Sequence, residues 1–267
     1  MLYIIGTPIG NLKELSFRAV EVLKQMDYIA CEDTRTSSTL LNHYEIKKPL
    51  VSYHKFNEQS NLNKLINALK NGKDIALISD AGMPVISDPG NILVNECIKN
   101  NIEYTVVSGP CAFVNAFIIS GYSAPFTFVG FLPNKNSDVK KLLNQLKTTS
   151  CTLIFYLAPH DIKTTFQTLY SHLGEREVCV VRELTKKFEQ ATFCTLKDGY
   201  NGVEKGEFVL VVKGQEVENH LIDLSIKQHF EHYINNGLSK NDAIKQVAHD
   251  KKIKKDVVYK EINQINN

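Results

Sequence analysis

Two carboxylates lie in one short glycine-rich loop at residues 78–90, which reads ISDAGMPVISDPG. The loop follows an apolar run and carries Asp80 and Asp88 between its glycines and prolines. Glycine-rich loops after strands often bind phosphate through bare backbone N–H groups, but two carboxylates would repel an anion. Carboxylates and backbone carbonyls instead accept hydrogen bonds from ribose hydroxyls or an ammonium group, and they tolerate a nearby cation. These preferences suggest S-adenosylmethionine, which has all three features and no phosphate.

Four other polar stretches follow apolar runs in the same way. Together with the loop above they are GTPIGN (6–11), EDTR (32–35), HKFNE (54–58), SDAGMP (79–84) and SGPCA (108–112). Loops of α/β proteins are generally polar and rich in glycine and proline. That general composition does not explain why so many ionisable side chains occur in these five loops. The carboxyl ends of parallel strands share one rim of a sheet. We therefore expect all five loops to line one crevice that binds a ligand.

Several common ligand sites do not match the sequence. There is no G-x-x-x-x-G-K-[ST] loop, and GTPIGN lacks the third glycine and the downstream acid of a dinucleotide-binding loop. Histidines and cysteines do not occur at metal-binding spacing, and EDTR alone is weak evidence for magnesium. We therefore expect no metal.

The elements that position these loops can be read from the apolar pattern of the 267 residues. Strands are expected at 2–5, 28–31, 50–53, 75–79 and 104–107, with helices between them, including 58–70 and one that starts at Ser16. This alternation predicts a mostly parallel sheet covered by helices. Strands recur at 126–131, 152–156, 177–181, 188–193 and 208–212, as if the pattern repeated. We predict an α/β lobe at 1–120, a second at 121–216 and a helical tail at 217–267.

Composition limits the class of protein. Hydrophobic residues make up 43% and charged residues 22%, which is normal for a globular enzyme, and a net charge of +2 says little about partners. The six cysteines occur singly and are expected to be reduced. The chain starts with an apolar strand and not with a signal peptide, and no apolar run reaches the roughly 20 residues of a membrane helix. We expect a cytoplasmic protein that makes no membrane contact.

The tail has a pattern of its own. Ser239 is a plausible N-cap, and Ala243, Val247 and Ala248 form an apolar face before a turn and a second helix. This spacing resembles a helix-turn-helix, and the lysines beside it suit contacts with phosphates. The alternative is a solvated lysine run on a small packing helix. The lysines are Lys251, Lys252, Lys254 and Lys255.

The motifs closely resemble one known family. The segments that match it are LYIIGTPIGNLKELSFRAVEVLKQMDYIACEDTR, ALISDAGMPVISDPG, SGPCA, GFLPNK and RELTKKFE. They resemble the bacterial ribosomal RNA small-subunit methyltransferase I family, of the tetrapyrrole methylase superfamily, over nearly the whole chain. The resemblance implies two α/β lobes with S-adenosylmethionine in the cleft between them, usually as a homodimer. It also implies 2′-O-methylation of cytidine 1402 of the 16S rRNA, in standard rRNA numbering, within the 30S subunit.

The resemblance also suggests roles for individual residues. Those expected near the donor are Ile9, Asp80, Gly82, Met83, Pro110, Cys111, Ala112, Tyr156 and Leu157. A ribose hydroxyl benefits from a nearby general base, and the sequence leaves four candidates: Glu32, Asp33, His54 and Glu183. Residues expected to face the RNA, besides the tail lysines, are Asn11, Arg35, Asn57 and Lys186. Asn11 could instead hydrogen-bond its own loop, and Glu183 and Lys186 could form a solvated strand end.

The chain departs from the family pattern at three places. Met83 stands where the family usually has threonine, and Phe56 stands where it has a further histidine. LAPHD (157–161) replaces a common Glu-Ser-Pro-His-Arg, so the expected acid and arginine are missing. Two other functions remain open: methylation of a small tetrapyrrole precursor, and a non-catalytic nucleic-acid-binding regulator that senses a ligand.

Overall fold

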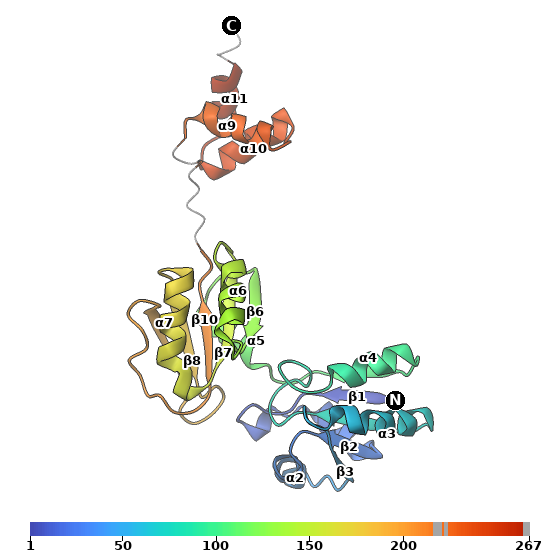
Figure 1. The fold of residues 1–267 in the computed structure, drawn as a ribbon. Helices are drawn as coiled ribbons and strands as arrows, with labels where there is room; N and C mark the ends of the chain where they lie inside the picture. Colours follow the sequence, from blue (N-terminus) through green and yellow to red (C-terminus); the bar gives the residue numbers. More distant parts are fainter. Residues whose placement is uncertain (216–220, 222–223, 264–267) are drawn as a thin grey trace. The chain divides into compact units, whose positions relative to one another are not determined.

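A computed structural model describes residues 1–215, 221 and 224–263. The chain forms two compact units, Met1–Gln215 and Glu216–Asn267. The first unit contains two five-stranded sheets, and the second is helical in its described part (Figure 1).

The first sheet is entirely parallel, as the alternating sequence pattern predicts. Its strands lie side by side in the order β3-β2-β4-β1-β5. Their bounds are β1 Leu2–Ile5, β2 Tyr28–Cys31, β3 Leu50–Ser52, β4 Ile75–Ile78 and β5 Tyr104–Val107. All five carboxyl ends therefore lie at one rim, from which the polar loops continue.

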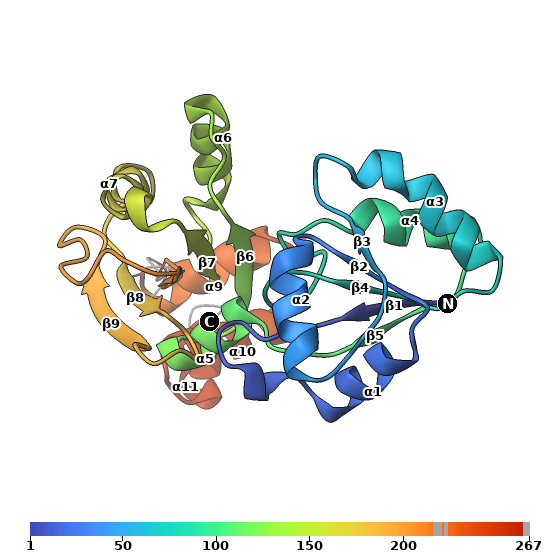
Figure 2. The same ribbon diagram turned by 90° about the horizontal axis from the view of Figure 1, so that it is seen from below.

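Two helices cover each face of this sheet (Figure 2). The four helices are α1 Phe17–Gln25, α2 Thr34–His43, α3 Glu58–Lys70 and α4 Asn91–Lys99. Residues of α1 and α2 are buried against one face, and residues of α3 and α4 against the other. Ser16 caps α1 by accepting a hydrogen bond from the N–H of Ala19, as its position suggested.

The second sheet is mixed, so the expectation of a repeated parallel pattern was wrong. Its strands lie in the order β6-β7-β10-β8-β9, and only β6 and β7 pair in parallel. Their bounds are β6 Phe126–Gly130, β7 Thr152–Leu157, β8 Glu177–Arg182, β9 Gln190–Thr195 and β10 Phe208–Val212. β8 and β9 are joined by a short loop without a crossover helix, which only antiparallel neighbours allow. β10 then inserts between β7 and β8, antiparallel to both.

Helices also cover both faces of this sheet. α6 (Asn136–Leu146) and α7 (Ile162–Leu173) pack on one face, and α5 (Ala112–Ser120) packs on the other. Single turns of 3₁₀ helix, η1 (Leu12–Glu14) and η2 (Pro159–Asp161), follow β1 and β7. Ile9, from the loop after β1, is buried with the α5 side of the second sheet, so the sheets share a core at that point.

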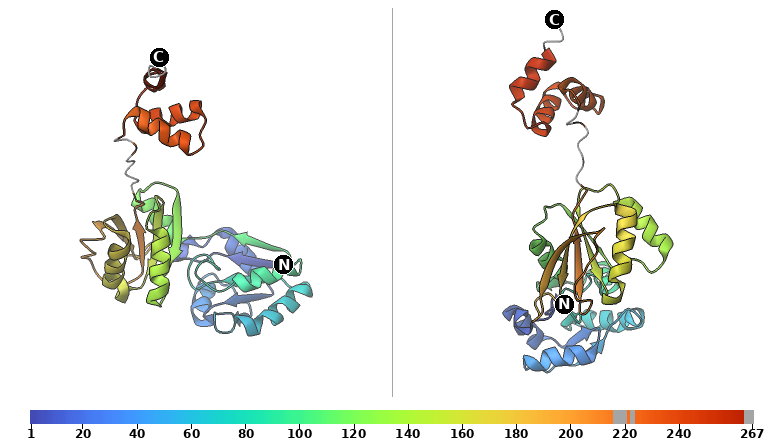
Figure 3. Two further views of the ribbon diagram at one scale, coloured as in Figure 1. Left: turned by 45° about the horizontal axis from the view of Figure 1, so that its top comes forward. Right: turned by 90° about the vertical axis from the view of Figure 1, so that its left-hand side faces the viewer.

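The C-terminal unit contains three described helices that pack together (Figure 3). They are α9 (Ile226–Asn235), α10 (Lys240–Asp250) and α11 (Lys255–Asn263). Ser239 caps α10, and Ala243, Val247 and Ala248 are buried, as predicted. The buried carboxylate of Asp250 joins α9 to α10 by accepting hydrogen bonds from Tyr233 and Gln246 and by lying 3.1 Å from His229 Nε2.

Among the described residues, no helix is both long and apolar enough to span a membrane. All six cysteines are free thiols, and Cys31, Cys97 and Cys179 are buried.

Candidate functional site

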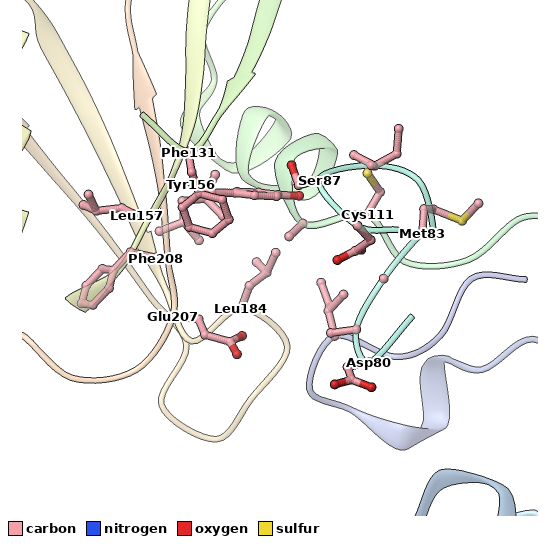
Figure 4. A pocket seen from close by; sticks show the side chains of 18 residues that line it. Asp80, Met83, Ser87, Cys111, Phe131, Tyr156, Leu157, Leu184, Glu207 and Phe208 are labelled. Carbon is pink, nitrogen blue, oxygen red and sulfur yellow. The ribbon is translucent and has the colours of Figure 1, made fainter. Parts of the chain in front are cut away.

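A cavity of about 310 Å³ lies at the carboxyl-end rim of the first sheet and opens against the second sheet. The first sheet contributes residues from the loops after β1, β4 and β5, and the second contributes the ends of β6, β7 and β8 and the start of β10. Figure 4 shows Met83, Cys111 and Asp80 on one side, with Tyr156, Phe208 and Glu207 on the other. This volume is within the range of small-molecule sites, so the cavity can hold a ligand of cofactor size.

Eight of the nine residues predicted to contact a donor line this cavity. The ninth, Pro110, immediately precedes the lining residue Cys111 in the chain. Three of the five polar loops supply the lining, while EDTR and HKFNE continue along the same rim beyond it. The prediction that all five line one crevice was therefore too broad. Nine other lining residues were not among those predicted to contact a donor: Ala81, Ile86, Ser87, Phe131, Val181, Leu184, Glu207, Phe208 and Val209. Most of these come from the second sheet. The expectation that ligand contacts lie at the carboxyl ends of strands, used for the first sheet, would have indicated several of them.

A buried threonine, Thr7, joins the loops after β1 and β4, both of which line the cavity. Thr7 pairs with Gly82 through two backbone hydrogen bonds of 2.9 and 3.1 Å, and its hydroxyl lies 3.1 Å from the Ser79 carbonyl. Gly6 lies so close to Gly109 that a Cβ on Gly6 would come within 2.7 Å of the Gly109 Cα. Larger side chains would force the loops after β1 and β5 apart. The lining is therefore preorganised by the backbone.

Several non-glycine residues of the lining loops have positive φ angles. Val85 has φ 74° and Ser87 has φ 67° in the loop after β4, while Glu183 has φ 51° and Thr185 has φ 66° in the loop after β8. Such angles are costly, above all for a β-branched residue, and they persist only where surrounding contacts impose them. Their concentration in two loops beside the cavity is typical of a functional site.

A cluster of carboxylates gives the rim its electrostatic character. Burial raises the pKa of Asp88 to about 7, helped by the negative charges of Glu32 and Asp80. The pKa of Glu32 is also raised, first by burial and then by Asp80. Asp80, whose Oδ1 accepts a hydrogen bond of 3.1 Å from the Asp33 N–H, has a raised pKa for the same reason of burial. A cation beside these three groups would relieve their repulsion.

This cluster predicts a pH-dependent stability of the ligand-free protein. Because the pKa of Asp88 is about 7 in the folded protein against an ordinary value of 3.8, folded chains bind more protons than unfolded chains between these limits. Stability should therefore fall as pH rises from about 4 to about 7. Asp88→Asn should raise the unfolding temperature strongly at pH 8 and less at pH 5. Thermal denaturation at both values tests this, with the exposed Glu103→Gln as control. Equal effects of Asp88→Asn at both pH values would contradict it.

The Asp33 carboxylate is bonded by Arg35 of the helix that it caps. It caps α2 by accepting a hydrogen bond of 2.8 Å from the Arg35 N–H, and its other oxygen lies 2.7 Å from the Arg35 guanidinium. The hydrogen bonds from Arg35 lower the pKa of Asp33 to about 2. A carboxylate with so low a pKa is a weak base. The Arg35 side chain is itself 90% exposed.

His54 and Asn57 form one turn after β3. The Asn57 side chain accepts a hydrogen bond of 2.7 Å from the His54 N–H and donates to the Ser52 carbonyl. The Nδ1 atom of His54 is buried and has no hydrogen-bond partner among the described residues. Asn11 likewise accepts a hydrogen bond from the Lys13 N–H as the cap of η1, which is the bond within its own loop that was considered as the alternative to RNA contact.

Glu183 and Lys186 lie at the edge of the cavity in one ion-pair group. The Lys186 ammonium lies 3.1 Å from Glu183 and 3.1 Å from Glu207, which lines the cavity. Glu183 also accepts a hydrogen bond of 2.8 Å from the Glu207 N–H, and this bond is the main cause that lowers the pKa of Glu183. A Cβ on Gly10 would come within 2.4 Å of the Lys186 side chain, so the loop after β1 packs directly on this group.

The four tail lysines are not equivalent. Lys252, Lys254 and Lys255 are exposed at the turn between α10 and α11. Lys251 is partly buried, and its ammonium donates a hydrogen bond of 2.6 Å to the Leu224 carbonyl. No group of three or more His, Cys, Asp or Glu side chains within the described ranges could hold a metal ion.

Comparisons with known proteins agree with this architecture. Residues 1–199 match the family model of Tetrapyrrole (Corrin/Porphyrin) Methylases. The chain is similar to the ribosomal RNA small subunit methyltransferase I of Halalkalibacterium halodurans, with 44% identity over 97% of this chain and 93% of that protein. The protein of the same name from Mycoplasmopsis pulmonis is 48% identical over 79% of this chain and 96% of its own length.

Solved structures show the same fold at low identity. The cobalt precorrin-4 methyltransferase CbiF matches with a TM-score of 0.58 and 19% identity, over 79% of this chain and 93% of that one. The methyltransferase CobJ matches with a TM-score of 0.61 and 14% identity, over 80% and 93%. The fold predicted from the sequence, two α/β lobes of the tetrapyrrole methylase type followed by helices, is confirmed.

Proposed function

This chain belongs to the ribosomal RNA small subunit methyltransferase I family of the tetrapyrrole methylases, and from this we propose that it transfers a methyl group from S-adenosylmethionine to the ribose 2′-hydroxyl of cytidine 1402 in 16S rRNA. The substrate would be the RNA within the 30S subunit. The observation that carries the proposal is the cavity itself, because its rim combines carboxylates with apolar walls.

The residues of the cavity fit S-adenosylmethionine. Asp80 and Asp88 can accept hydrogen bonds from ribose hydroxyls and oppose a positive charge, and the backbone near Gly82 and Ala112 can approach a ligand closely. Ile9, Leu184 and Val209 give the opposite walls an apolar surface. When bound, the donor supplies an electrophilic methyl group, and alignment with the acceptor is the main task left to the protein.

Among the four candidates for the general base, Glu32 has the most suitable environment. Its pKa is raised by burial and by Asp80, so it is a stronger base than an ordinary carboxylate. Asp33 is held by Arg35, and Glu183 is held by Lys186 and the Glu207 N–H. Glu32 lies beside Asp80 on the rim and within electrostatic range of His54. We assign proton removal from the ribose hydroxyl to Glu32.

An apolar surface supports the expectation of a homodimer. β5 is an edge strand whose Tyr104 and Val106 side chains are exposed, and α5, which follows it, exposes Val114 and Ile118. Exposed apolar side chains on an edge strand and on the helix that follows it in the chain favour association unless they are covered. We propose that a second copy of the chain covers it.

Ile118→Glu is expected to prevent this association. Ile118 is 69% exposed, so a charge there costs little within one chain, but burial in a dimer would require its desolvation. Light scattering after size-exclusion chromatography should report a dimer for the natural chain and a monomer for the variant. The matched control is Ile98→Glu, at a 52% exposed position on α4. An unchanged mass for Ile118→Glu would place any dimer contact elsewhere.

The proposed reaction can be tested with labelled S-adenosylmethionine and two acceptors. Undermethylated 30S subunits should be labelled, and digestion of their RNA should yield 2′-O-methylcytidine at position 1402. A tetrapyrrole precursor should remain unlabelled. Label in the tetrapyrrole would favour the small-molecule methylase, and donor binding without transfer to either acceptor would favour the non-catalytic regulator.

A further inference from the structure

Phe56 is a large apolar side chain that the fold leaves in solvent. It lies in the turn after β3, between His54 and Asn57, and it is 96% exposed. The Asn57 side chain bonds to the backbone of His54 and Ser52, so the turn that carries the ring is fixed at both ends. The His54 ring packs against it edge-on, with centroids 6.1 Å apart. Nothing in the folding of the chain accounts for a phenylalanine at this position.

Phe188 has the same character on the other sheet. It was expected to begin a strand, but the strand starts at Gln190 and Phe188 lies in the loop after β8 with 64% of its surface exposed. Its carbonyl accepts a hydrogen bond from Arg182, and the Lys187 ammonium lies 5.6 Å from the centre of its ring. The same loop supplies Leu184 to the cavity lining.

Phe56 follows β3 on the same rim as the cavity, and Phe188 belongs to the loop that supplies Leu184 to the cavity lining. β3 lies two strands from β4, and the loop after β4 supplies Asp80 to the cavity. At the usual strand spacing, the ends of β3 and β4 are about 10 Å apart, which places the turn of Phe56 about that far from Asp80 along the rim. Glu32 follows β2, the strand between β3 and β4. A lysine precedes each ring in the chain: Lys55 before Phe56, and Lys187 before Phe188. The 90% exposed Arg35, which pairs with Asp33, follows β2 on the same rim as Phe56.

Exposed aromatic rings interleaved with cations match the chemistry of single-stranded nucleic acid. Bases stack on aromatic rings, while lysine and arginine neutralise the phosphates between them. A base-paired nucleotide cannot present its ribose to a recessed cavity without leaving its helix, and the exposed neighbours then need surfaces to stack on. A protein partner would gain from the rings but would have no use for cations on both sides.

We propose that Phe56 and Phe188 are stacking platforms for bases of single-stranded RNA on either side of the methylated nucleotide. This inference rests on the proposed function, whose substrate class it specifies. The two residues position the RNA and take no part in the transfer of the methyl group.

The chain contains no tryptophan, which allows a direct test. Phe56→Trp and Phe188→Trp each introduce a single fluorophore at the proposed platform. Titration with a single-stranded RNA oligonucleotide of the sequence around cytidine 1402 should quench both, and the same oligonucleotide annealed to its complement should not. Ile98→Trp is the control, because Ile98 is exposed near the end of α4 that lies away from the rim. Equal quenching by single and double strands, or none, would overturn the proposal.

Kinetics separate this proposal from the function on which it rests. Phe56→Ala and Phe188→Ala should each raise the KM for 30S subunits by about 5- to 100-fold, the usual effect of removing one base–aromatic stack, with S-adenosylmethionine affinity unchanged. Phe56→Tyr should restore the natural KM. If the natural chain methylates 30S subunits and the alanine variants do so equally well, the platforms are refuted and the function stands. If the natural chain methylates no RNA, the function fails, while the fluorescence result is still decisive for stacking.

Discussion

Glu32→Gln is expected to slow methyl transfer by about 10²- to 10⁴-fold, the usual contribution of a general base. The substitution keeps the size and the hydrogen-bonding oxygen of the side chain but removes its ability to take a proton. Because Asp80 and Asp88 remain, we expect S-adenosylmethionine affinity to fall by less than about tenfold. The raised pKa of Glu32 further predicts that the natural rate declines as pH falls and this carboxylate is protonated.

Single-turnover methylation of 30S subunits measures the first effect, and calorimetry with the donor measures the second. Asp33→Asn is the matched control, since it removes a neighbouring carboxylate yet leaves an oxygen to cap α2. It should retain most of the rate. If Glu32→Gln turns over normally and Asp33→Asn does not, the assignment of the base is wrong.

Removal of the C-terminal unit is expected to weaken binding to the 30S subunit while leaving the cavity intact. Every residue that lines the cavity lies within Met1–Gln215. The similar protein from Mycoplasmopsis pulmonis matches 79% of this chain over 96% of its own length, so it has room for a counterpart of the first unit and for little more. A chain that ends at Gln215 should bind S-adenosylmethionine normally, and its RNA binding should depend less steeply on salt.

The exposed lysines of the tail should account for much of that salt dependence. Replacement of Lys252, Lys254 and Lys255 by alanine should lower the log–log slope by up to about 2.7, because each phosphate that a lysine neutralises adds up to about 0.9. Filter binding across a salt series measures it. Lys251→Ala is the control, because its ammonium bonds to the Leu224 carbonyl and its removal should reduce stability more than slope. An unchanged slope in the triple variant would mean that these lysines are exposed to solvent without contacting phosphates and that other residues bind the RNA.

The first sheet and its site could be predicted from the sequence because local pattern and topology agree there. Apolar runs alternate with amphipathic helices, and a parallel sheet brings the ends of its strands together, so loop residues such as Asp80 and Cys111 could be placed at one rim. Ser16 and Ser239 marked helix starts because a capping hydroxyl acts within three residues. These signals depend on nearby residues or on a regular topology.

The second sheet could not be predicted equally well, because its pairing depends on contacts between distant segments. Nothing in the composition of β10 indicates that it inserts between β7 and β8. Phe188 was assigned to a strand from its hydrophobicity, but the loop after β8 holds it outside the sheet. The occupation of Asp33 by Arg35 and the raised pKa of Glu32 are likewise products of burial and of neighbours across strands.

The three carboxylates at the rim have a consequence for the end of the proposed catalytic cycle. Methyl transfer from a sulfonium leaves a neutral thioether, so the spent donor has the shape of the fresh one without its positive charge. Beside Glu32, Asp80 and Asp88 the charged form is attracted and the neutral form is not. The proposed reaction would thus itself weaken the binding of its by-product. This discrimination should fade below about pH 7, where Asp88 becomes protonated, and inhibition by the by-product should then increase.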